Sequence, residues 1–595
     1  MRRWLFVALA LATLFACRND QALQQEAQAF IDQYTAEYQQ LYYESAKAEW
    51  KSNTYIVPGD TSVAAATRRA NEALAAFTGR VETIESARRF LEERDRLTDL
   101  QARQLDAILY NAANNPQTVP ELVKERIKAE TAQVEALYGF TFMVDGKEIR
   151  PNDIDDILRN DTDLGTRLAT WEASKAVGRE LRDGLARLRD LRNQTVQALG
   201  YDNYFAYQVS AYGMTTEEMM ALNRRLVEEV MPLYRELHTY ARHELAERYG
   251  AEAVPDLLPA HWLPNRWGQD WNAMVTVDGF DLDGALREKP REWLMEQGER
   301  FYTSIGFDPL PASYWEKSSL YPLPDDAEYK KNNHASAWHM NLEDDVRCLM
   351  SIVPTADMYE TVHHELGHIY YYMAYTNPEV PLLLREGANR AYHEAVGSLL
   401  GLAAMQKPFL QHLGLVPPDA QTDEMQTLLK EALNYIVFIP WSAGVMTEFE
   451  YELYANNLPV EEFNSKWWEL KRKYQGIVPP SERGAEFCDA ASKTHINNDA
   501  AQYYDYALSF VQLFQLHGHI AENILGEDPR ATNYYGSKEV GTFLHGILSK
   551  GASSDWRDLM RENIGEDLNA GAMLTYFAPL SEYLKATNSG RNHTL

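Results

Sequence analysis

The amino-acid sequence predicts an all-α protein. Apolar residues recur at three- and four-residue spacings with charged residues between them over most of the chain, which is typical of amphipathic helices. The alternation of polar and apolar residues that is typical of strands is scarce. No low-complexity linker and no repeat of fixed period divides the chain, so we expect one large helical domain with a helical N-terminal cover.

The expected helices follow one another from the N-terminal region to the last third of the chain. The strongest periodic stretches are 21–50, 67–77, 86–112, 163–200, 215–250 and 423–441. One short hairpin is predicted at 138–151, where YGFTFMVDGKEIRP places Asp-Gly between alternating residues. Loops rich in proline and glycine, such as LPAHWLPNRWG at 258–268, interrupt the helices.

The first 17 residues predict an export signal. Two arginines precede an apolar run from Trp4 to Ala16, which is too short for a permanent membrane span but suits a secretory leader. The ending LFAC resembles the lipobox of bacterial lipoproteins, in which the cysteine is lipidated and becomes the mature N-terminus. Two alternatives remain open, a lipid anchor at Cys17 and an ordinary cleaved signal peptide. Either one predicts an exported protein, in the bacterial periplasm or anchored to a membrane.

Charge and cysteine content exclude several classes of protein. The formal net charge of −30 disfavours binding to nucleic acid or to anionic lipid headgroups. Only Cys348 and Cys488 follow the leader, so the protein is not a disulfide scaffold and depends on its core for stability. Whether these two cysteines pair is left open by the sequence.

The stretch HHELGH at 363–368 carries the clearest chemical signal. His364 and His368 are four residues apart, so on a helix their imidazoles lie on one face and can share a zinc ion. Glu365 is placed to deprotonate a water that the zinc activates. A helix that carries histidines by chance is the alternative. A third ligand decides between them, because catalytic zinc usually has three protein ligands.

Glu394 is the candidate for the third ligand. A turn-rich stretch at 376–392 separates the first helix from a second one that contains HEAVGSLLGLAAM, and a helix that returns can bring Glu394 beside the two histidines. The alternative is an acid favoured by the dipole at the start of a helix. His363 and His393 flank this site, and local hydrogen bonding is the expected role for both.

These motifs together resemble the angiotensin-converting enzyme (peptidyl-dipeptidase A) family, zinc peptidases that remove dipeptides from the C-termini of peptides. The resemblance runs through most of the chain after the leader and is strongest after residue 260. The matching stretches are HHELGHIYYYMAY, LREGAN, YHEAVG, NHASAW, RWGQDW, KYQGIVPP, KTHI, YYDY and AMLTYFAPLSEYL.

The resemblance implies a role for each matching residue. It implies zinc ligation by His364, His368 and Glu394, and a general base and acid at Glu365. His495 and Tyr506 match residues that stabilise the tetrahedral oxyanion. His334 and the backbone of Ala335 and Ala337 match a segment that aligns the substrate as an added strand, and Gln269, Lys493 and Tyr503 match a trio that holds its C-terminal carboxylate.

The sequence also departs from the family pattern. Ser398 stands where the family commonly has an aspartate that orients a ligand histidine, so we expect zinc to be held less tightly. Asn333 replaces a cysteine, which leaves Cys348 without its family disulfide. Asp505 replaces an arginine associated with chloride binding, with Tyr240 as the remaining matched contact. At a second anion site Trp467 is retained, Lys471 is the basic partner, and Val209 replaces a distant arginine.

We therefore expect a zinc peptidyl-dipeptidase that acts on oligopeptides with a free C-terminal carboxylate and does not require chloride. The resemblance implies one domain at 18–595, an all-α ellipsoid with a deep channel and with lid helices in about 21–115, after a signal peptide at 1–17. Two other functions stay open. One is a zinc oligopeptidase or single-residue carboxypeptidase, and the other is an inactive peptide-binding lipoprotein. The sequence leaves the physiological peptide substrate open.

Overall fold

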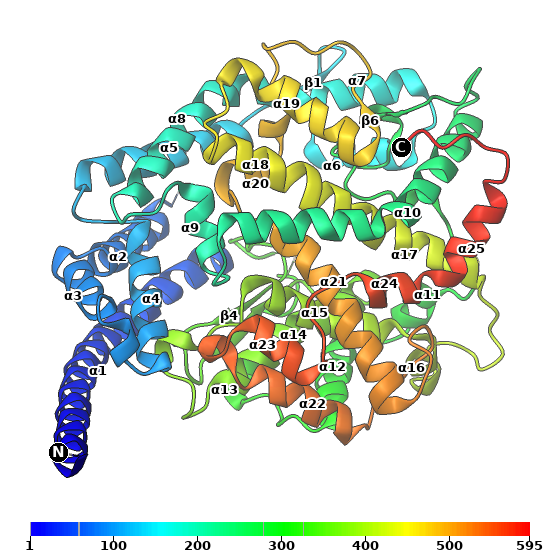
Figure 1. Cartoon of the computed structure of the whole chain (residues 1–595). Helices are drawn as coiled ribbons and strands as arrows, with labels where there is room; N and C mark the ends of the chain where they lie inside the picture. The colour runs from blue at the N-terminus through cyan, green and yellow to red at the C-terminus, as the bar shows by residue number, and fades with distance from the viewer. Residues whose placement is uncertain (1, 58–59, 278, 325) are drawn as a thin grey trace. The chain divides into compact units, whose positions relative to one another are not determined.

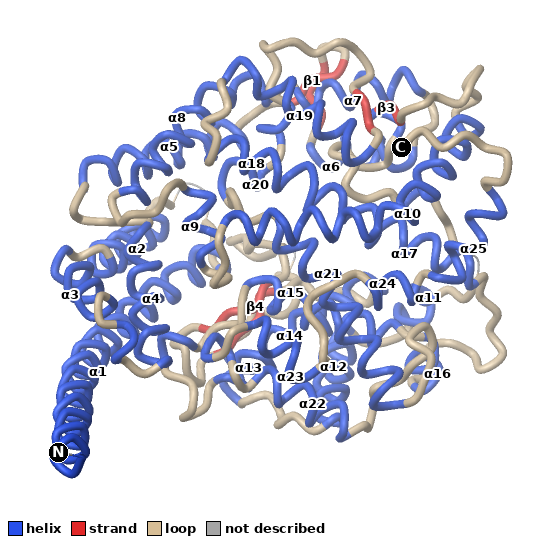
Figure 2. Tube along the Cα trace, viewed as in Figure 1, coloured by secondary structure: helices blue, strands red, loops and turns tan. Residues whose placement is uncertain are grey.

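The computed structural model describes the backbone of residues 2–57, 60–277, 279–324 and 326–595, and side chains from residue 20 onward with the same gaps. It divides into two compact units. Unit 1 comprises residues 1–123, 289–389 and 535–556, and unit 2 comprises residues 124–288, 390–534 and 557–595. Helices dominate and the strands are short (Figures 1 and 2), which confirms the all-α prediction.

Unit 1 contains the N-terminal helices and the helix that carries HHELGH. Its helices are α1 Arg2–Thr54, α2 Ser62–Thr78, α3 Val81–Leu91, α4 Asp99–Ala113, α12 Arg291–Ile305, α13 Ala312–Lys317, α14 Ala356–Tyr375 and α22 Lys538–Leu548. A hairpin in this unit pairs β4 Ser336–His339 with β5 Val346–Leu349 in antiparallel register, with Ala337 opposite Cys348.

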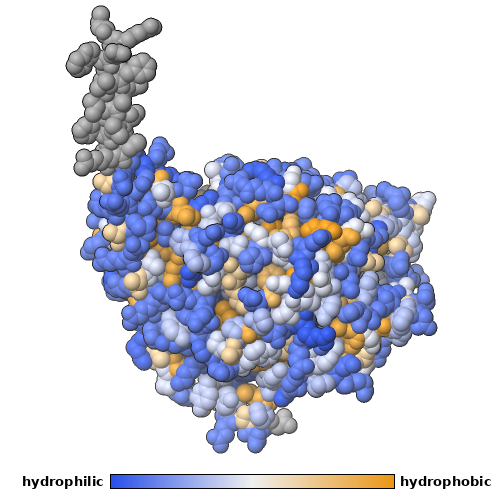
Figure 3. All heavy atoms as spheres, turned by 90° about the horizontal axis from the view of Figure 1, so that it is seen from below, coloured by the Kyte–Doolittle hydropathy of each residue, from blue (hydrophilic) through white to orange (hydrophobic). Residues whose placement is uncertain are grey.

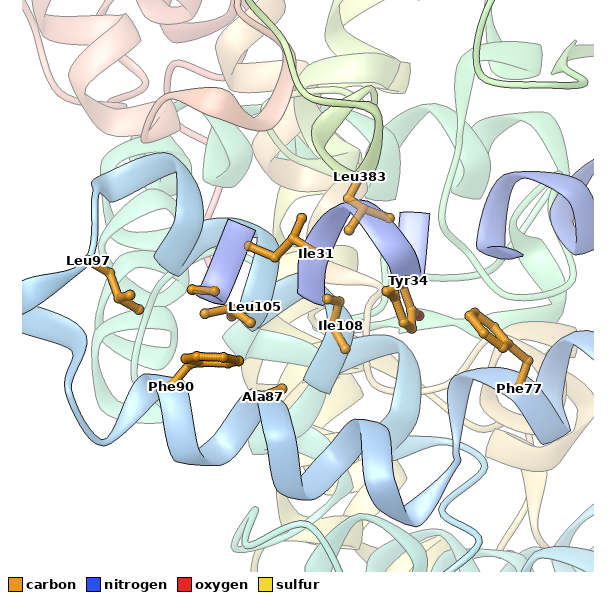
Figure 4. Packing of buried hydrophobic residues seen from close by; sticks show 10 residues of the cluster. Ile31, Tyr34, Phe77, Ala87, Phe90, Leu97, Leu105, Ile108 and Leu383 are labelled. Atoms are coloured by element: carbon orange, nitrogen blue, oxygen red, sulfur yellow. The ribbon is translucent and has the colours of Figure 1, made fainter. Parts of the chain in front are cut away.

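The N-terminal helices of unit 1 share a hydrophobic core of their own. Ile31 and Tyr34 of α1 pack with Phe77 of α2, Phe90 of α3 and Leu105 of α4 (Figure 4). Burial of several large apolar side chains supplies most of the stability of such a helical group, at about 1.5–3 kcal/mol for each fully buried side chain. The expected lid helices at 21–115 therefore form a packed group. Their role as a lid stays a prediction.

Close packing holds α12 against α14. A Cβ atom added to Gly298 of α12 would lie 2.6 Å from Leu366 Cδ1 and 3.1 Å from Val362 Cγ1, both on α14. A larger residue at this position would force the side chains of Leu366 and Val362 to shift. Tyr302 of α12 adds a hydrogen bond from its hydroxyl to the carbonyl oxygen of His363, at 2.7 Å. Helix α12 thus holds α14, the helix that carries His364 and His368, in place.

Unit 2 contains the longest internal helix and the C-terminal helices. Its helices are α5 Pro120–Tyr138, α6 Pro151–Asn160, α7 Leu164–Lys175, α8 Val177–Gln197, α9 Tyr204–Ser210, α10 Thr216–Arg248, α11 Leu282–Arg287, α15 Arg390–Met405, α16 Lys407–His412, α17 Glu424–Ile439, α18 Thr447–Tyr454, α19 Phe463–Leu470, α20 Thr494–Asn498, α21 Tyr504–Gly518, α23 Trp556–Asn563, α24 Gly571–Tyr576 and α25 Ala578–Thr587. Three π-helical turns follow α17, α19 and α21 among the described residues, at Pro440–Met446, Lys471–Gln475 and His519–Leu525.

Two small sheets accompany these helices. The predicted hairpin is confirmed as β1 Phe142–Val144 and β2 Lys147–Ile149. Its turn residues Asp145 and Gly146 both have positive φ, 51° and 76°, as a two-residue turn of this kind requires. β3 Leu258–Pro259 and β6 Ile477–Val478 form a short parallel pair.

Two of the periodic stretches are divided in the structure. The stretch 86–112 contains α3 and α4 with a short 3₁₀ turn at Arg94–Arg96 between them, because Thr98 starts a new helix through a capping box with Gln101. The stretch 163–200 contains α7 and α8, which meet at Ala176.

The surface and the helices bear on whether the protein has apolar regions that could contact a membrane. On the face in Figure 3 hydrophilic residues predominate, as the charge of the chain leads one to expect. Among the described residues no helix is long and apolar enough to cross a membrane. The predicted signal peptide at 1–17 and the lipid site at Cys17 lie outside the residues whose side chains are described, so both stay predictions.

Candidate active site

The helix α14 presents His364 and His368 side by side. Thr355 begins the helix by accepting a hydrogen bond from the Met358 amide at 3.3 Å. The Nε2 atoms of His364 and His368 are 3.1 Å apart. Two nitrogens bound to one tetrahedral zinc ion at about 2.1 Å would be separated by about 3.4 Å, so this pair needs almost no movement to bind one.

Glu394 completes a three-residue group. The candidate ligand atoms of His364, His368 and Glu394 all lie within 4.8 Å of one another. Within the part of the chain that the structure describes, no other group of three histidine, cysteine or acidic residues meets this criterion. Two imidazoles and one carboxylate are a donor set typical of catalytic zinc. The residues present therefore fit the metal that the sequence predicts.

His363 has a structural role in α14 and is not one of the candidate zinc ligands. It is fully buried, and its Nδ1 is 2.8 Å from the carbonyl oxygen of Tyr359, one turn earlier. Burial lowers the pKa of His363 to about 4, so its ring is neutral. It contributes to the packing of α14 through ring contacts with Tyr359 and Phe301.

Glu365 is 7% exposed and lies near the buried face of the β4–β5 hairpin. Burial first, and then the negative charge of Glu365, raise the pKa of Cys348 on β5 well above its usual value. Cys348 and Cys488 are both free thiols and are both buried, and Asn333 offers no thiol that could pair with Cys348. Glu365 is thus a buried residue that directly follows His364 and lies close to Cys348 of β5.

The segment expected to align the substrate includes strand β4. Its hydrogen-bonded neighbour among the described strands is β5, on one side only. The hydroxyl of Tyr372 on α14 donates to the Ala337 carbonyl at 3.3 Å. His334 and Ala335 precede the strand, and His334 Nδ1 is 3.0 Å from the Ala335 carbonyl. His334 is exposed.

In unit 2 the trio expected to hold a carboxylate is brought together. Lys493 donates from Nζ to Gln269 Oε1 at 2.7 Å, and the hydroxyl of Tyr503 lies 3.5 Å from the same oxygen. Lys493 is 5% exposed and stands 4.4 Å from the ring centre of Trp267. Burial, helped by the charge of Arg266, lowers the pKa of Lys493 to about 7. A cation in such a place is poorly solvated and is suited to pair with an anion.

The two residues expected to stabilise an oxyanion also meet. His495 on α20 has Nε2 3.4 Å from the hydroxyl of Tyr506 on α21. Burial, and then the charge of Lys493, lower the pKa of His495 to about 4, while burial raises the pKa of Tyr506 to about 12. At neutral pH the imidazole is therefore neutral and the phenol keeps its proton. Both side chains have a hydrogen-bond donor to offer.

The surroundings of Asp505 differ from the sequence expectation. The tyrosine that contacts Asp505 is Tyr212, whose hydroxyl donates to Oδ1 at 2.5 Å, and not Tyr240. Arg390 Nε lies 3.3 Å from Asp505 Oδ2. Sequence reasoning missed Arg390 and Tyr212 because each is far from Asp505 in the chain. The one sequence feature that could have indicated a role for Arg390 is its position four residues before Glu394.

Trp467 and Lys471, which the resemblance places at a second anion site, line a small pocket in unit 2. Lys175 and Arg266 also line this pocket, and Val209 does not. Lys471 donates to the Trp267 carbonyl at 2.7 Å and to Gln475 Oε1 at 2.5 Å. Burial lowers the pKa of both Lys175 and Lys471 well below the usual value.

Comparison with known proteins finds related enzymes. The chain is 28% identical to the angiotensin-converting enzyme of Rattus norvegicus over 597 residues, which cover 96% of this chain and 44% of that protein. It is 32% identical to the enzyme of Bos taurus over 462 residues (74% and 34%), and 28% identical to that of Oryctolagus cuniculus over 597 residues (96% and 44%). The chain thus spans less than half the length of these relatives.

The family model described as angiotensin-converting enzyme, peptidase M2, matches residues 21–595, which include every candidate residue above. The chain therefore belongs to the peptidase M2 family of angiotensin-converting enzymes.

Proposed function

We propose that the protein is a zinc-dependent peptidyl-dipeptidase that releases dipeptides from the free C-terminus of oligopeptides. The observation that supports this specificity best is the contact of Lys493 with Gln269, with Tyr503 beside them. A buried cation with two neutral polar partners suits a peptide's terminal carboxylate. An endopeptidase has no need of such a group.

The residues then take the following roles. His364, His368 and Glu394 hold the zinc, which when bound lowers the pKa of water and polarises the carbonyl of the scissile bond. Glu365 takes a proton from the attacking water and delivers it to the leaving amine. His495 and Tyr506 donate hydrogen bonds to the oxygen on which negative charge develops. His334, Ala335 and Ala337 align the peptide as an added strand along β4.

Mass spectrometry of the products from a library of free-acid peptides tests this proposal. Successive loss of two residues from the C-terminus is expected, and a chelator should abolish it. Loss of single residues would instead identify a carboxypeptidase, and internal cleavage an oligopeptidase. Binding of peptides without any cleavage, in protein that carries zinc, would identify the inactive peptide-binding lipoprotein.

Chloride is expected to have little effect on turnover. Burial raises the pKa of Asp505 to about 7, while Arg390 and Tyr212 stabilise its ionised form. As a carboxylate, Asp505 repels an anion from this position. Turnover should agree within about twofold between chloride and acetate at matched ionic strength, which holds general screening constant. A severalfold rise specific to chloride would refute this expectation. If Lys471→Gln abolished that rise, the pocket of Trp467 and Lys471 would be its source.

We also propose that Cys17 is lipidated and anchors the enzyme to a membrane, outside the cytoplasm. The proposal is supported by the apolar run that ends in LFAC. Full-length protein from a bacterial host should partition into the detergent phase, and Cys17→Ser should partition into the aqueous phase. An aqueous wild type with an unmodified N-terminus beyond Cys17 would contradict the proposal.

A further inference from the structure

Asp505 is the most deeply buried member of a charged cluster in unit 2. It lies in the first turn of α21, directly before Tyr506, and 1% of its side chain is exposed. Tyr212 donates to Oδ1 at 2.5 Å, and Arg390 Nε stands 3.3 Å from Oδ2. The Tyr212 hydroxyl also accepts a hydrogen bond from the Ala391 amide at 3.0 Å. Asp505 is thus connected twice to the start of α15.

Arg390 holds a second acid with the rest of its guanidinium group. Nη1 and Nη2 donate to Asp499 Oδ1 and Oδ2 at 2.9 and 2.7 Å, a two-bond arrangement that fixes orientation as well as distance. Asp499 directly follows α20, which carries His495. One arginine on α15 therefore reaches both ends of the segment that joins His495 to Tyr506.

That segment has an unusual backbone. Ala501 has φ 60°, a left-handed conformation that a non-glycine residue adopts only when its surroundings enforce it. Its amide donates to Oε1 of the buried Glu450 at 2.6 Å. Gln502 donates to Asp499 Oδ1 at 2.9 Å. The turn between the two oxyanion residues is therefore held from several sides.

Arg390 connects this cluster to the helix that carries Glu394. Arg390 begins α15 and lies one turn before Glu394 on the same helix. Helix α15 packs against α21. A change in how the first turns of these two helices meet therefore moves Glu394 relative to Tyr506.

We propose that Arg390 is a positioning residue that, through Asp505 and Asp499, sets Glu394 relative to His495 and Tyr506. This inference rests on the proposed function, since it takes Glu394 as a zinc ligand and the other two as oxyanion donors. The side-chain contacts of Arg390 are with Asp499 and Asp505, so it acts through these residues. Arg390 thereby keeps Glu394 at a fixed position relative to His495 and Tyr506. The carboxylate of Asp505 faces the guanidinium group of Arg390.

Arg390→Ala is expected to release zinc to a chelator about 10-fold faster and to lower kcat about 10- to 100-fold, because supporting contacts around a metal site have effects of this size. KM should change less than about threefold, since the hydrogen bond of Lys493 to Gln269 involves neither Asp499 nor Asp505. Arg390→Lys keeps the charge but not the two-bond geometry, so it should be intermediate. Loss of stability alone would not change zinc release or kcat well below the melting temperature.

Arg94→Ala is the matched control. Arg94 binds Asp106 through the same two-bond geometry, at 2.9 and 2.7 Å, and belongs to the N-terminal part of unit 1. This variant should keep the zinc release rate and kcat within about twofold of wild type. Asp505→Asn preserves an acceptor for Tyr212 and removes the charge facing Arg390, and it should lower kcat about 3- to 10-fold. Combined with Arg390→Ala it should add little, because both remove one interaction.

The proposal is overturned if Arg390→Ala keeps both its zinc release rate and its kcat within twofold of wild type. It is also overturned if Arg94→Ala is impaired equally. If Arg390→Ala fails to fold, as judged by circular dichroism, Asp505→Asn carries the same test. A wild-type protein that binds zinc but releases no dipeptides would refute the proposed function, and zinc release would still decide the role of Arg390.

Discussion

Glu365→Gln is expected to lower kcat for dipeptide release by about 10²- to 10⁴-fold while the protein keeps its zinc, the range typical of general acid–base groups. The amide has the shape of the carboxylate, so the packing of this 7%-exposed side chain is preserved. It cannot accept the proton of the attacking water. The measurement is kcat on a free-acid peptide together with the zinc content of the same sample.

Glu360→Gln on the same helix is the matched control for this prediction. Glu360 is half-buried, lies outside the ligand motif, and has a pKa that burial raises. Its replacement should leave kcat within about twofold. Near-normal turnover in Glu365→Gln would refute the assigned role. A loss of zinc in that variant would show that Glu365 acts in metal binding.

Amidation of the peptide's C-terminus is expected to lower kcat/KM by about 30- to several-thousand-fold, corresponding to roughly 2–5 kcal/mol. The amide removes the charge that pairs with Lys493, and the buried ammonium keeps its hydrogen bond to Gln269 but has no anionic partner. Matched acid and amide forms of one peptide provide the measurement. Equal cleavage of the two forms would favour the oligopeptidase.

The preference for the free acid should also depend on pH. Burial lowers the pKa of Lys493 to about 7 in the free protein, so its ammonium form predominates below that pH. The acid-to-amide ratio of kcat/KM should therefore be largest below pH 7 and should decline as pH rises through 7. Because both peptides share the zinc and Glu365, other titrations cancel in the ratio. Lys493→Met should lose the preference and its pH dependence together.

Local signals made much of the fold predictable. The helix α10 starts at the capping box of Thr215 and Glu218 and ends before Gly250, which has φ 60°, as the periodic stretch 215–250 indicated. The Asp-Gly turn likewise determined the hairpin at 138–151. The break at Arg94–Arg96 was missed because the periodicity continues across it. The capping pair Thr98 and Gln101 was its one available signal.

The pairs of site residues that are close in the sequence could be predicted, and the pairs that are far apart in the sequence could not be predicted from spacing. His364 and His368 are one helical turn apart, so the spacing alone predicted their pairing. Lys493 and Gln269 are 224 residues apart, and only the family resemblance connected them. Tyr212 and Asp505 are separated by 293 residues, and no pattern in the sequence relates them. Arg390 was missed because a helix-start arginine is an ordinary surface residue until its partners are known.

The measurement that tests the central claim most directly is the zinc content of purified protein, determined per chain by mass spectrometry of the metal. Wild type and Glu365→Gln should each hold one zinc, and His364→Ala should hold almost none, because one of three protein ligands is lost. Zinc added to chelator-treated wild type should restore dipeptide release up to one equivalent. A His364→Ala protein that keeps one tightly bound zinc would contradict the assignment of the metal to His364, His368 and Glu394.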